Sequence, residues 1–293
     1  MLSKDQQKHN NSLSADAKSR AAEEYVRPRR RIDVIDGSTH RQLILEQFTQ
    51  QAAQFQATHR SAEAALRIAI EFSAVGPADT VLDVACGPGV VACALAEVAQ
   101  HVTGIDITPT MLDHAQRLQA AKNLKNVVWK LGEVSSLPFE PNAFSLVISR
   151  YAVHHLQTPA ADLSEMARVC NPDGRVVLID SAPSADKSEE FNRLECMRDP
   201  SHTRAFTQEG LEDLMCRAGL TVLRSHLYAW EVAVQGLLER SFPAPGDMAK
   251  LWKLYEADVG LNHIGMNARY LDGELHVTFP TLILVGSKGS LGS

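Results

Sequence analysis

The chain has 293 residues, of which 45% are hydrophobic, so it can bury a core as one large domain or as one domain with a lid. Its formal net charge is −6, and no strong basic field is available to hold DNA or RNA. The sequence has no run of about 20 apolar residues, which excludes a membrane-spanning helix. Five cysteines without a Cys-x-x-Cys pair or zinc-like spacing, and no apolar signal segment, predict a reduced cytoplasmic protein without a metal site.

Residues 1–40 are polar, and we expect them to form a mobile N-terminal segment. One domain is expected over residues 41–288, followed by a flexible tail at 289–293. It opens with two helices, the first containing Phe48 and Phe55. From Thr80 onwards, apolar strands alternate with amphipathic helices, which is typical of an α/β protein with a parallel sheet covered on both faces. The expected strands and helices are 80–85, 89–99, 101–106, 109–121, 126–130, 144–149, 160–170 and 174–181.

The C-terminal third changes character. Thr207 is expected to cap a helix that Gly219 ends, and residues 220–232 and 275–285 are expected to be extended. Pro280 removes one hydrogen-bond donor from the last strand, so we expect a bulge or a local edge there. Residues 183–205 and 235–270 interrupt the alternation, and we predict that they form a lid over the acceptor.

The most informative segment is Val81–Ala92, where an apolar strand runs into a Gly-x-Gly turn and then an apolar helix. This pattern binds a nucleotide-like ligand, because Gly87 and Gly89 carry no Cβ to hold it off. Asp83 lies at the expected carboxyl end of the strand. Its carboxylate would repel a pyrophosphate and attract a cofactor with a cationic amino group.

Asp106 closes the next apolar strand. A carboxylate at this point can accept two hydrogen bonds from the hydroxyl groups of a ribose. It can also cap the helix that starts beyond Thr108 and Pro109, and the two roles can coexist. The glycine pattern alone equally fits a dinucleotide, so it leaves the cofactor open.

Further motifs follow in order: Leu137-Pro-Phe139, Ala152-Val-His-His-Leu156 and Asn171-Pro-Asp-Gly174. With these, the chain resembles the class I S-adenosylmethionine-dependent methyltransferases. Within them it is most similar to small-molecule enzymes related to the ubiquinone-biosynthesis C-methyltransferases. The resemblance is strong from about Phe48 to Asp180 and does not reach the first forty residues.

The resemblance implies a doubly wound, mostly parallel seven-stranded sheet of order 3-2-1-4-5-7-6, with the last strand antiparallel. It also implies S-adenosyl-L-methionine as the cofactor and a small-molecule methyl acceptor. The cofactor would contact the loop and the ends of the next strands. The residues expected to bind it are Asp83, Cys86, Gly87, Pro88, Gly89, Asp106, Ile107, Met111, Glu133, Ser149 and Arg150.

Within that set, Ile107 and Met111 are expected to flank the adenine, with Glu133 near its edge. Ser149 or Arg150 would offer a main-chain carbonyl to the amino group. We further expect Phe48 and Phe55 to close the site from the N-terminal helix.

His154 and His155 follow the fourth strand and are the catalytic candidates. An uncharged histidine can take the proton of an acceptor hydroxyl, since its unperturbed pKa is ~6.5. The alternative is that both rings only pack or bond to loop backbone, and that proximity carries the reaction at carbon or nitrogen.

Two other functions are weighed. An NAD(P)-dependent oxidoreductase would use the same Gly-x-Gly turn, but Asp83 and the Leu-Pro-Phe segment argue against it. A catalytically silent regulatory protein that keeps the pocket is the other. The acceptor and the choice between monomer and homodimer cannot be read from this sequence.

Overall fold

The structure is a computed structural model that describes residues 36–52 and 60–289. The chain divides into two compact units, residues 1–39 and residues 40–293. Of the first unit only residues 36–39 are described, and there the Asp36 carboxylate accepts hydrogen bonds from the backbone N–H groups of Ser38 and Thr39. Phe55 lies outside the described residues, as does most of the segment that we expected to be mobile.

Helices and strands alternate along the second unit. The helices are α2 (Gly37–Ala52), α3 (Arg60–Ser73), α4 (Val90–Leu95), α5 (Pro109–Ala121), α6 (Pro159–Val169), α7 (Ser188–Arg198), α8 (Gln208–Arg217), α9 (Val234–Glu239) and α10 (Asp247–Ala257), with short 3-10 turns η2 (Val134–Ser136) and η3 (Val153–His155). The strands are β1 (Thr80–Val84), β2 (His101–Asp106), β3 (Val127–Leu131), β4 (Phe144–Arg150), β5 (Cys170–Ser181), β6 (Thr221–Ala233), β7 (Arg269–Leu271) and β8 (Glu274–Ser287).

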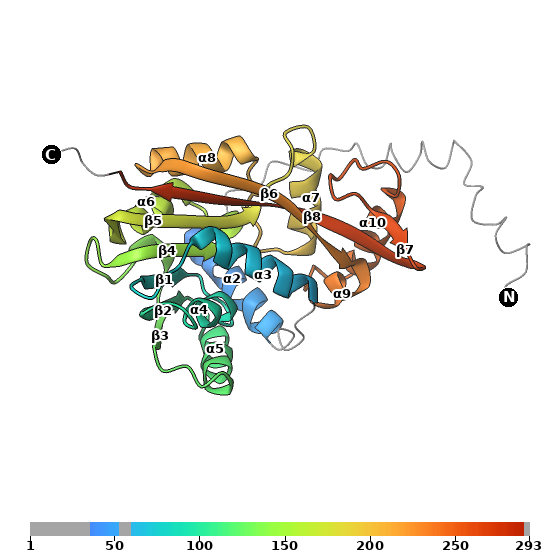
Figure 1. The fold of residues 1–293 in the computed structure, drawn as a ribbon. Coiled ribbons are helices and arrows are strands. Elements are labelled where there is room, and N and C mark those ends of the chain that lie inside the picture. The colour runs from blue at the N-terminus through green and yellow to red at the C-terminus, as the bar shows by residue number, and fades with distance from the viewer. Residues whose placement is uncertain (1–35, 53–59, 290–293) are drawn as a thin grey trace, which may run out of the picture. The chain divides into compact units, whose positions relative to one another are not determined.

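The strands form one sheet of order β3-β2-β1-β4-β5-β8-β6, with β7 paired to β8 (Figure 1). The first five strands are parallel, and β8 is antiparallel to both β5 and β6. The expected order is therefore confirmed, with β8 as the seventh long strand. The short strand β7 was not predicted. Because β6 runs parallel to β5, the carboxyl ends of β1, β2, β4, β5 and β6 share one edge of the sheet.

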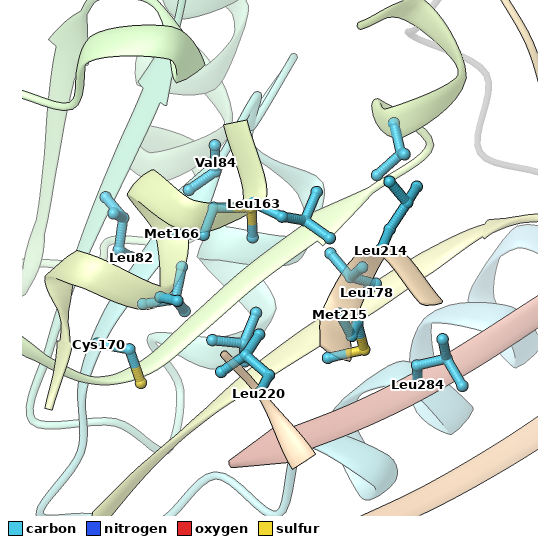
Figure 2. Packing of buried hydrophobic residues seen from close by; sticks show 14 of the residues in the cluster. Leu82, Val84, Leu163, Met166, Cys170, Leu178, Leu214, Met215, Leu220 and Leu284 are labelled. Atoms are coloured by element: carbon cyan, nitrogen blue, oxygen red, sulfur yellow. The ribbon is translucent and has the colours of Figure 1, made fainter. Parts of the chain in front are cut away.

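Two apolar layers sandwich the sheet, because its central strands are buried on both faces. On one face, Ala69 of α3 and Leu95 of α4 pack against residues such as Ile148 of β4. On the other face, α6 and α8 cover the same strands. Figure 2 shows this second cluster, in which Leu163 and Met166 of α6 lie over Leu82 and Leu178.

A third apolar cluster lies past the carboxyl end of β5, against the last residues of β6 and the first residues of β8. It joins the two insertions, since Phe191 of α7 packs with Leu251 and Tyr255 of α10 and with Phe279 of β8. The segments 183–205 and 235–270 therefore form one small core of their own rather than separate loops.

The helix after β1 is shorter than expected, because α4 ends at Leu95 instead of near residue 99. The Asn126 side chain donates hydrogen bonds to the carbonyl groups of Ala96 and Ala99, both at 2.9 Å. These bonds satisfy carbonyls that a longer helix would have used and turn the chain into β2.

Of the two alternatives expected at Pro280, a bulge or a local edge, the structure shows no bulge. The pairing of β8 with β6 runs without a shift through Pro280, and the irregularity lies between Val222 and Arg224 instead. The carbonyl group of Pro280 accepts from the N–H of Ala182, just past the end of β5. The side of Pro280 that lacks an N–H therefore faces the place where β5 has ended. This is the local edge that we expected as the alternative to a bulge.

The cap predicted at Thr207 is confirmed. Its side chain accepts a hydrogen bond from the N–H of Gly210 at 3.2 Å, and α8 begins at the next residue. Gly219 follows the helix with φ of +80°, a left-handed conformation that glycine adopts readily.

Candidate active site

The loop between β1 and α4 has a left-handed backbone at Ala85, Gly87 and Gly89, with φ of 55°, 51° and 78°. The N–H of Cys86 donates to the carbonyl of Ile105 at 3.0 Å, which fixes the loop to β2. Tyr151, directly after β4, also has a positive φ of 54°. Such conformations cost a residue with a Cβ about 1–2 kcal/mol and gather at functional sites, so the ends of β1 and β4 are the strained part of this edge.

The two loop glycines have different surroundings. A Cβ added to Gly87 would meet nothing within 4 Å, so a ligand can approach the backbone there. A Cβ added to Gly89 would lie 2.6 Å from Trp129 and 2.8 Å from the Cβ of Ala115. The packing of α4 against α5 and β3 is therefore sufficient reason for glycine at position 89, apart from any cofactor.

We expect Gly89→Ala to lower the free energy of unfolding by about 2–4 kcal/mol, because overpacking adds to the left-handed strain. Gly87→Ala is the matched control, with the strain alone and a cost of about 1–2 kcal/mol. Urea unfolding measures both free-energy changes, provided that the dependence of the unfolding free energy on urea concentration is the same in each variant. Equal costs for the two variants would mean that Trp129 moves aside.

Two carboxylates lie at the ends of β1 and β2. Asp83 is 1% exposed and accepts one hydrogen bond, from the N–H of Ala92 at 3.0 Å. Burial, with the nearby charge of Asp106, raises the pKa of Asp83 to about 7, although the bond from Ala92 and the charge of Arg150 oppose this. Among the described residues Asp83 has no salt-bridge partner. A bound cation would therefore stabilise the ionised form of this buried carboxylate.

Asp106 holds the loop together. Its Oδ2 accepts from the N–H of Gly87 and its Oδ1 from the N–H of Thr108, both at 2.8 Å. Burial raises the pKa of Asp106 against these two bonds. The turn-forming role is thus present, and each oxygen retains a second lone pair for a hydroxyl group.

The other predicted cofactor residues lie around this edge with mixed exposure. Pro88 and Ile107 are half-buried, while Cys86 and Met111 are buried. Ser149 is buried and donates from its hydroxyl to the carbonyl of Val84 at 2.9 Å, which ties β4 to β1. The orientation of these residues toward an adenine or an amino group stays a prediction.

Helix α2 lies along the same edge. His40 donates from Nε2 to the carbonyl of His155 at 2.8 Å, and the Arg41 side chain donates to Glu133 at 2.6 Å. The ring of Phe48 meets His155 edge-on at 5.1 Å. Phe48 is thus beside the catalytic candidates, and Glu133, expected near the adenine, is an ion-pair partner of the helix.

His154 is held by a carboxylate. Its Nδ1 donates to Oδ1 of Asp180 at 2.5 Å, and Asp180 also accepts from the N–H of Val153 at 2.8 Å. Burial opposes a charge on His154, but the neighbouring Asp180 outweighs it, so the pKa of His154 is raised above its usual value. This arrangement fixes the tautomer and leaves Nε2 as the nitrogen that can accept a proton.

His155 has the opposite environment. Its Nδ1 donates to the carbonyl of Ser201 at 3.0 Å, and the Ser201 hydroxyl donates to Asp199 at 2.6 Å. Burial and the adjacent His154 lower the pKa of His155 to about 4. His202 completes the group, with its ring 5.3 Å from that of His154 and a pKa lowered by burial.

The adjacent histidines therefore differ in chemistry. Their ring centroids are 4.2 Å apart, yet His154 has a raised pKa and His155 stays neutral at any ordinary pH. Environments that separate two pKa values in this way assign the proton-transfer role to one member. His154 is therefore the candidate for that role.

Sequence reasoning missed several residues of this cluster. Asp180 ends β5 as Asp83 and Asp106 end β1 and β2, so the same strand-end rule would have found it. Asp199, Ser201 and His202 lie in an irregular segment, where no pattern indicates their contact with His155. Within residues 36–52 and 60–289 no cluster of histidine, cysteine and carboxylate residues could hold a metal ion, and no helix there is long and apolar enough to cross a membrane.

The fold, the glycine loop and the strand-end acids are those that the resemblance to class I S-adenosylmethionine-dependent methyltransferases implies. Residues 81–174 match the methyltransferase domain family, from β1 to the turn inside β5. The match covers about a third of the chain, and this segment is similar to that domain family.

Individual relatives agree. The chain is 38% identical over 126 residues to the uncharacterized methyltransferase YcgJ of Bacillus subtilis, covering 42% of this chain and 50% of that protein. It is 32% identical over 117 residues to the 2-phytyl-1,4-naphtoquinone methyltransferase of Trichormus variabilis, covering 39% and 51%. The chain thus spans about half the length of the curated relatives it matches.

Solved structures support the fold. The YcgJ crystal structure superposes with a TM-score of 0.70 at 23% identity, covering 78% of this chain and 99% of that one. The [4+2]-cyclase SpnF superposes with a TM-score of 0.60 at 19% identity, covering 80% and 83%. The second similarity means that this fold alone does not fix the reaction.

Proposed function

We propose that this protein transfers a methyl group from S-adenosylmethionine to a small-molecule acceptor, at oxygen or at carbon. The observation that carries this proposal is the His154–Asp180 hydrogen bond of 2.5 Å at the carboxyl edge, one strand from the glycine loop. A base in this position is needed only if the acceptor must lose a proton. The similarity to a quinone methyltransferase supports a quinol-like or phenolic acceptor, although that relative is only partly covered.

The residues present fit the cofactor. An α-amino cation would supply the partner that buried Asp83 lacks, and Gly87 leaves room for the methionyl backbone. The spare lone pairs of Asp106 suit two ribose hydroxyls. When bound, S-adenosylmethionine supplies an electrophilic methyl group on a sulfonium.

This fit predicts how cofactor affinity depends on pH. Because the pKa of Asp83 is about 7, only a small fraction is ionised at acidic pH. The α-amino group stays charged below its pKa of ~7.7–8.0. We therefore expect affinity for S-adenosylmethionine to rise roughly tenfold between pH 5.5 and 7, measured by titration calorimetry.

Asp83→Asn is the control for that prediction, because it keeps the bond from Ala92 and cannot ionise. Its affinity should be lower at neutral pH and nearly flat over the same range. A flat profile in the parent protein would mean that Asp83 does not face the amino group.

The residues of this chain then perform three tasks. His154 takes the acceptor proton at Nε2, and Asp180 orients the ring and stabilises the charge that forms there. His155, held neutral, can accept a hydrogen bond at Nε2 without competing for the proton. The joint core of 183–205 and 235–270 would cover the acceptor and exclude water.

A direct test uses S-adenosylmethionine labelled in the methyl group and a panel of phenols, quinols, amines and carbon acids. Label should appear in the methyl ether of a hydroxyl-bearing acceptor or in the methylated product of an activated-carbon acceptor, with S-adenosylhomocysteine released in equal amount. Binding of the cofactor without transfer to any class would favour the silent or non-methylating alternative. SpnF, a cyclase on this fold, makes that alternative concrete.

A further inference from the structure

Three buried hydrogen-bond donors without partners gather on the α3 face of the sheet. They are Nε of Arg150, the hydroxyl group of Tyr228 and the indole N–H of Trp230. Each belongs to a side chain whose apolar part is packed. A buried donor left unpaired costs about 1–3 kcal/mol, so a protein that keeps three together has a reason to keep them.

The strand register brings these groups together. Tyr228 lies opposite Thr281 and Trp230 opposite Phe279, so all four share one face of β6 and β8. The Tyr151 hydroxyl bonds to that of Thr281 at 3.0 Å, which carries the end of β4 across to the same place. The Arg150 guanidinium stacks on the Tyr151 ring, 4.8 Å from its centroid.

Arg150 connects this group to the cofactor end of the site. The pKa values of Asp83 and Tyr228 are both raised, and the charge of Arg150 opposes that rise in each case. The guanidinium therefore lies within electrostatic reach of both groups. Burial and the nearby Tyr151 raise the pKa of the Tyr228 phenol, which keeps its proton and stays a donor. Across the described residues, no carboxylate forms an ion pair with Arg150.

We propose that Arg150, Tyr228 and Trp230 bind a carboxylate group of the methyl acceptor. A carboxylate accepts from a guanidinium, a phenol and an indole N–H at once, and bonds to charged groups are the strong ones. Tyr228 and Trp230 stand on β6, on the side of β4 away from β1 and β2, which places them with the acceptor rather than the nucleoside. Trp230 stacks on Phe279 at 5.2 Å and 19°, so the surroundings of these donors are aromatic, which suits an aromatic acceptor.

This inference rests on the proposed function, and its test uses the protein saturated with S-adenosylhomocysteine. The probes are benzoate, 4-hydroxybenzoate and phenylacetate, each against its neutral amide. The carboxylates should bind at least tenfold more tightly than the amides. Arg150→Gln, which keeps the backbone carbonyl, should abolish that preference while the amides bind as before.

A tyrosine pair separates binding from folding. Tyr228→Phe removes a hydroxyl that lacks a hydrogen bond of normal geometry and interacts only electrostatically with Tyr151, so the midpoint of thermal unfolding should stay or rise while carboxylate affinity falls several-fold. Tyr151→Phe removes a hydroxyl bonded to Thr281 and should lower the midpoint. A lower midpoint in Tyr228→Phe would give that hydroxyl a structural role and overturn its assignment.

Either of two further results would overturn the proposal. One is that the parent protein binds carboxylates no more tightly than amides. The other is that Arg150→Gln weakens the binding of S-adenosylhomocysteine and leaves the affinity for the carboxylate probes unchanged. The second result would mean that Arg150 binds the carboxylate of the cofactor instead of that of the acceptor. If S-adenosylhomocysteine does not bind the parent at all, the proposed function fails instead, and the two failures are distinct.

Discussion

Replacing His154 by alanine is expected to lower the rate of methyl transfer to an oxygen acceptor by about 10²–10⁴-fold, while cofactor affinity stays nearly constant. The reason is that, among the described histidines of the candidate site, His154 is the one whose Nδ1 is paired with a carboxylate. Single-turnover kinetics with labelled cofactor measures the rate, and titration calorimetry measures the affinity.

The pH profile supplies the control. His154 must be neutral to accept a proton, so the parent rate should fall as pH drops through the raised pKa of His154. Asp180→Asn removes the charge that raises this pKa, so the acid limb should move to lower pH as the rate falls. His155→Ala should leave the limb in place. If His154→Ala and His155→Ala both retain parental turnover, the base is elsewhere or unnecessary, and a carbon or nitrogen acceptor becomes the better interpretation.

Asp106→Ala is expected to weaken S-adenosylmethionine binding by about 2–3 kcal/mol, or about 30–150-fold, if both ribose bonds are lost. The variant also removes the bonds from Gly87 and Thr108, so its unfolding free energy should fall as well. Titration calorimetry gives the first quantity and urea unfolding the second.

The 2′-deoxy analogue of S-adenosylhomocysteine separates the two roles of Asp106. In the parent protein, loss of this hydroxyl should weaken binding, and in Asp106→Ala it should make almost no further difference. Additive losses would mean that Asp106 acts on the loop alone. Unchanged affinity in Asp106→Ala would remove it from the ribose role.

The central strands could be predicted because each is a short apolar run that ends at a turn. Their order in the sheet could be predicted because the family resemblance implies it. The bounds of β2 and α5 agree with the sequence pattern to the residue. The end of α4 could not be predicted, since it depends on Asn126, which is distant in sequence and caps its carbonyls. At Pro280 the sequence could not decide between a bulge and a local edge, because the residue at which the neighbouring strand β5 ends is not a local property of β8.

The candidate site also contains residues that could be predicted from the sequence and residues that could not. Strand-end acids and the glycine turn follow from periodicity, so Asp83, Asp106 and Gly87 could be predicted as site residues. The reason for Gly89 was not, because the contact with Trp129 joins α4 to β3. The partners that separate His154 from His155 come from β5 and from the loop after α7. The strand-end rule could have found Asp180, but no sequence pattern indicates the contact of His155 with Ser201, 46 residues away.

The most direct measurement is titration calorimetry of the unmodified protein with S-adenosylmethionine and, separately, with NADH. We expect one molecule of S-adenosylmethionine bound per chain, with affinity that rises toward neutral pH as Asp83 ionises, and no heat from NADH. Saturable binding of NADH, or no binding of S-adenosylmethionine, would contradict the assignment of the site.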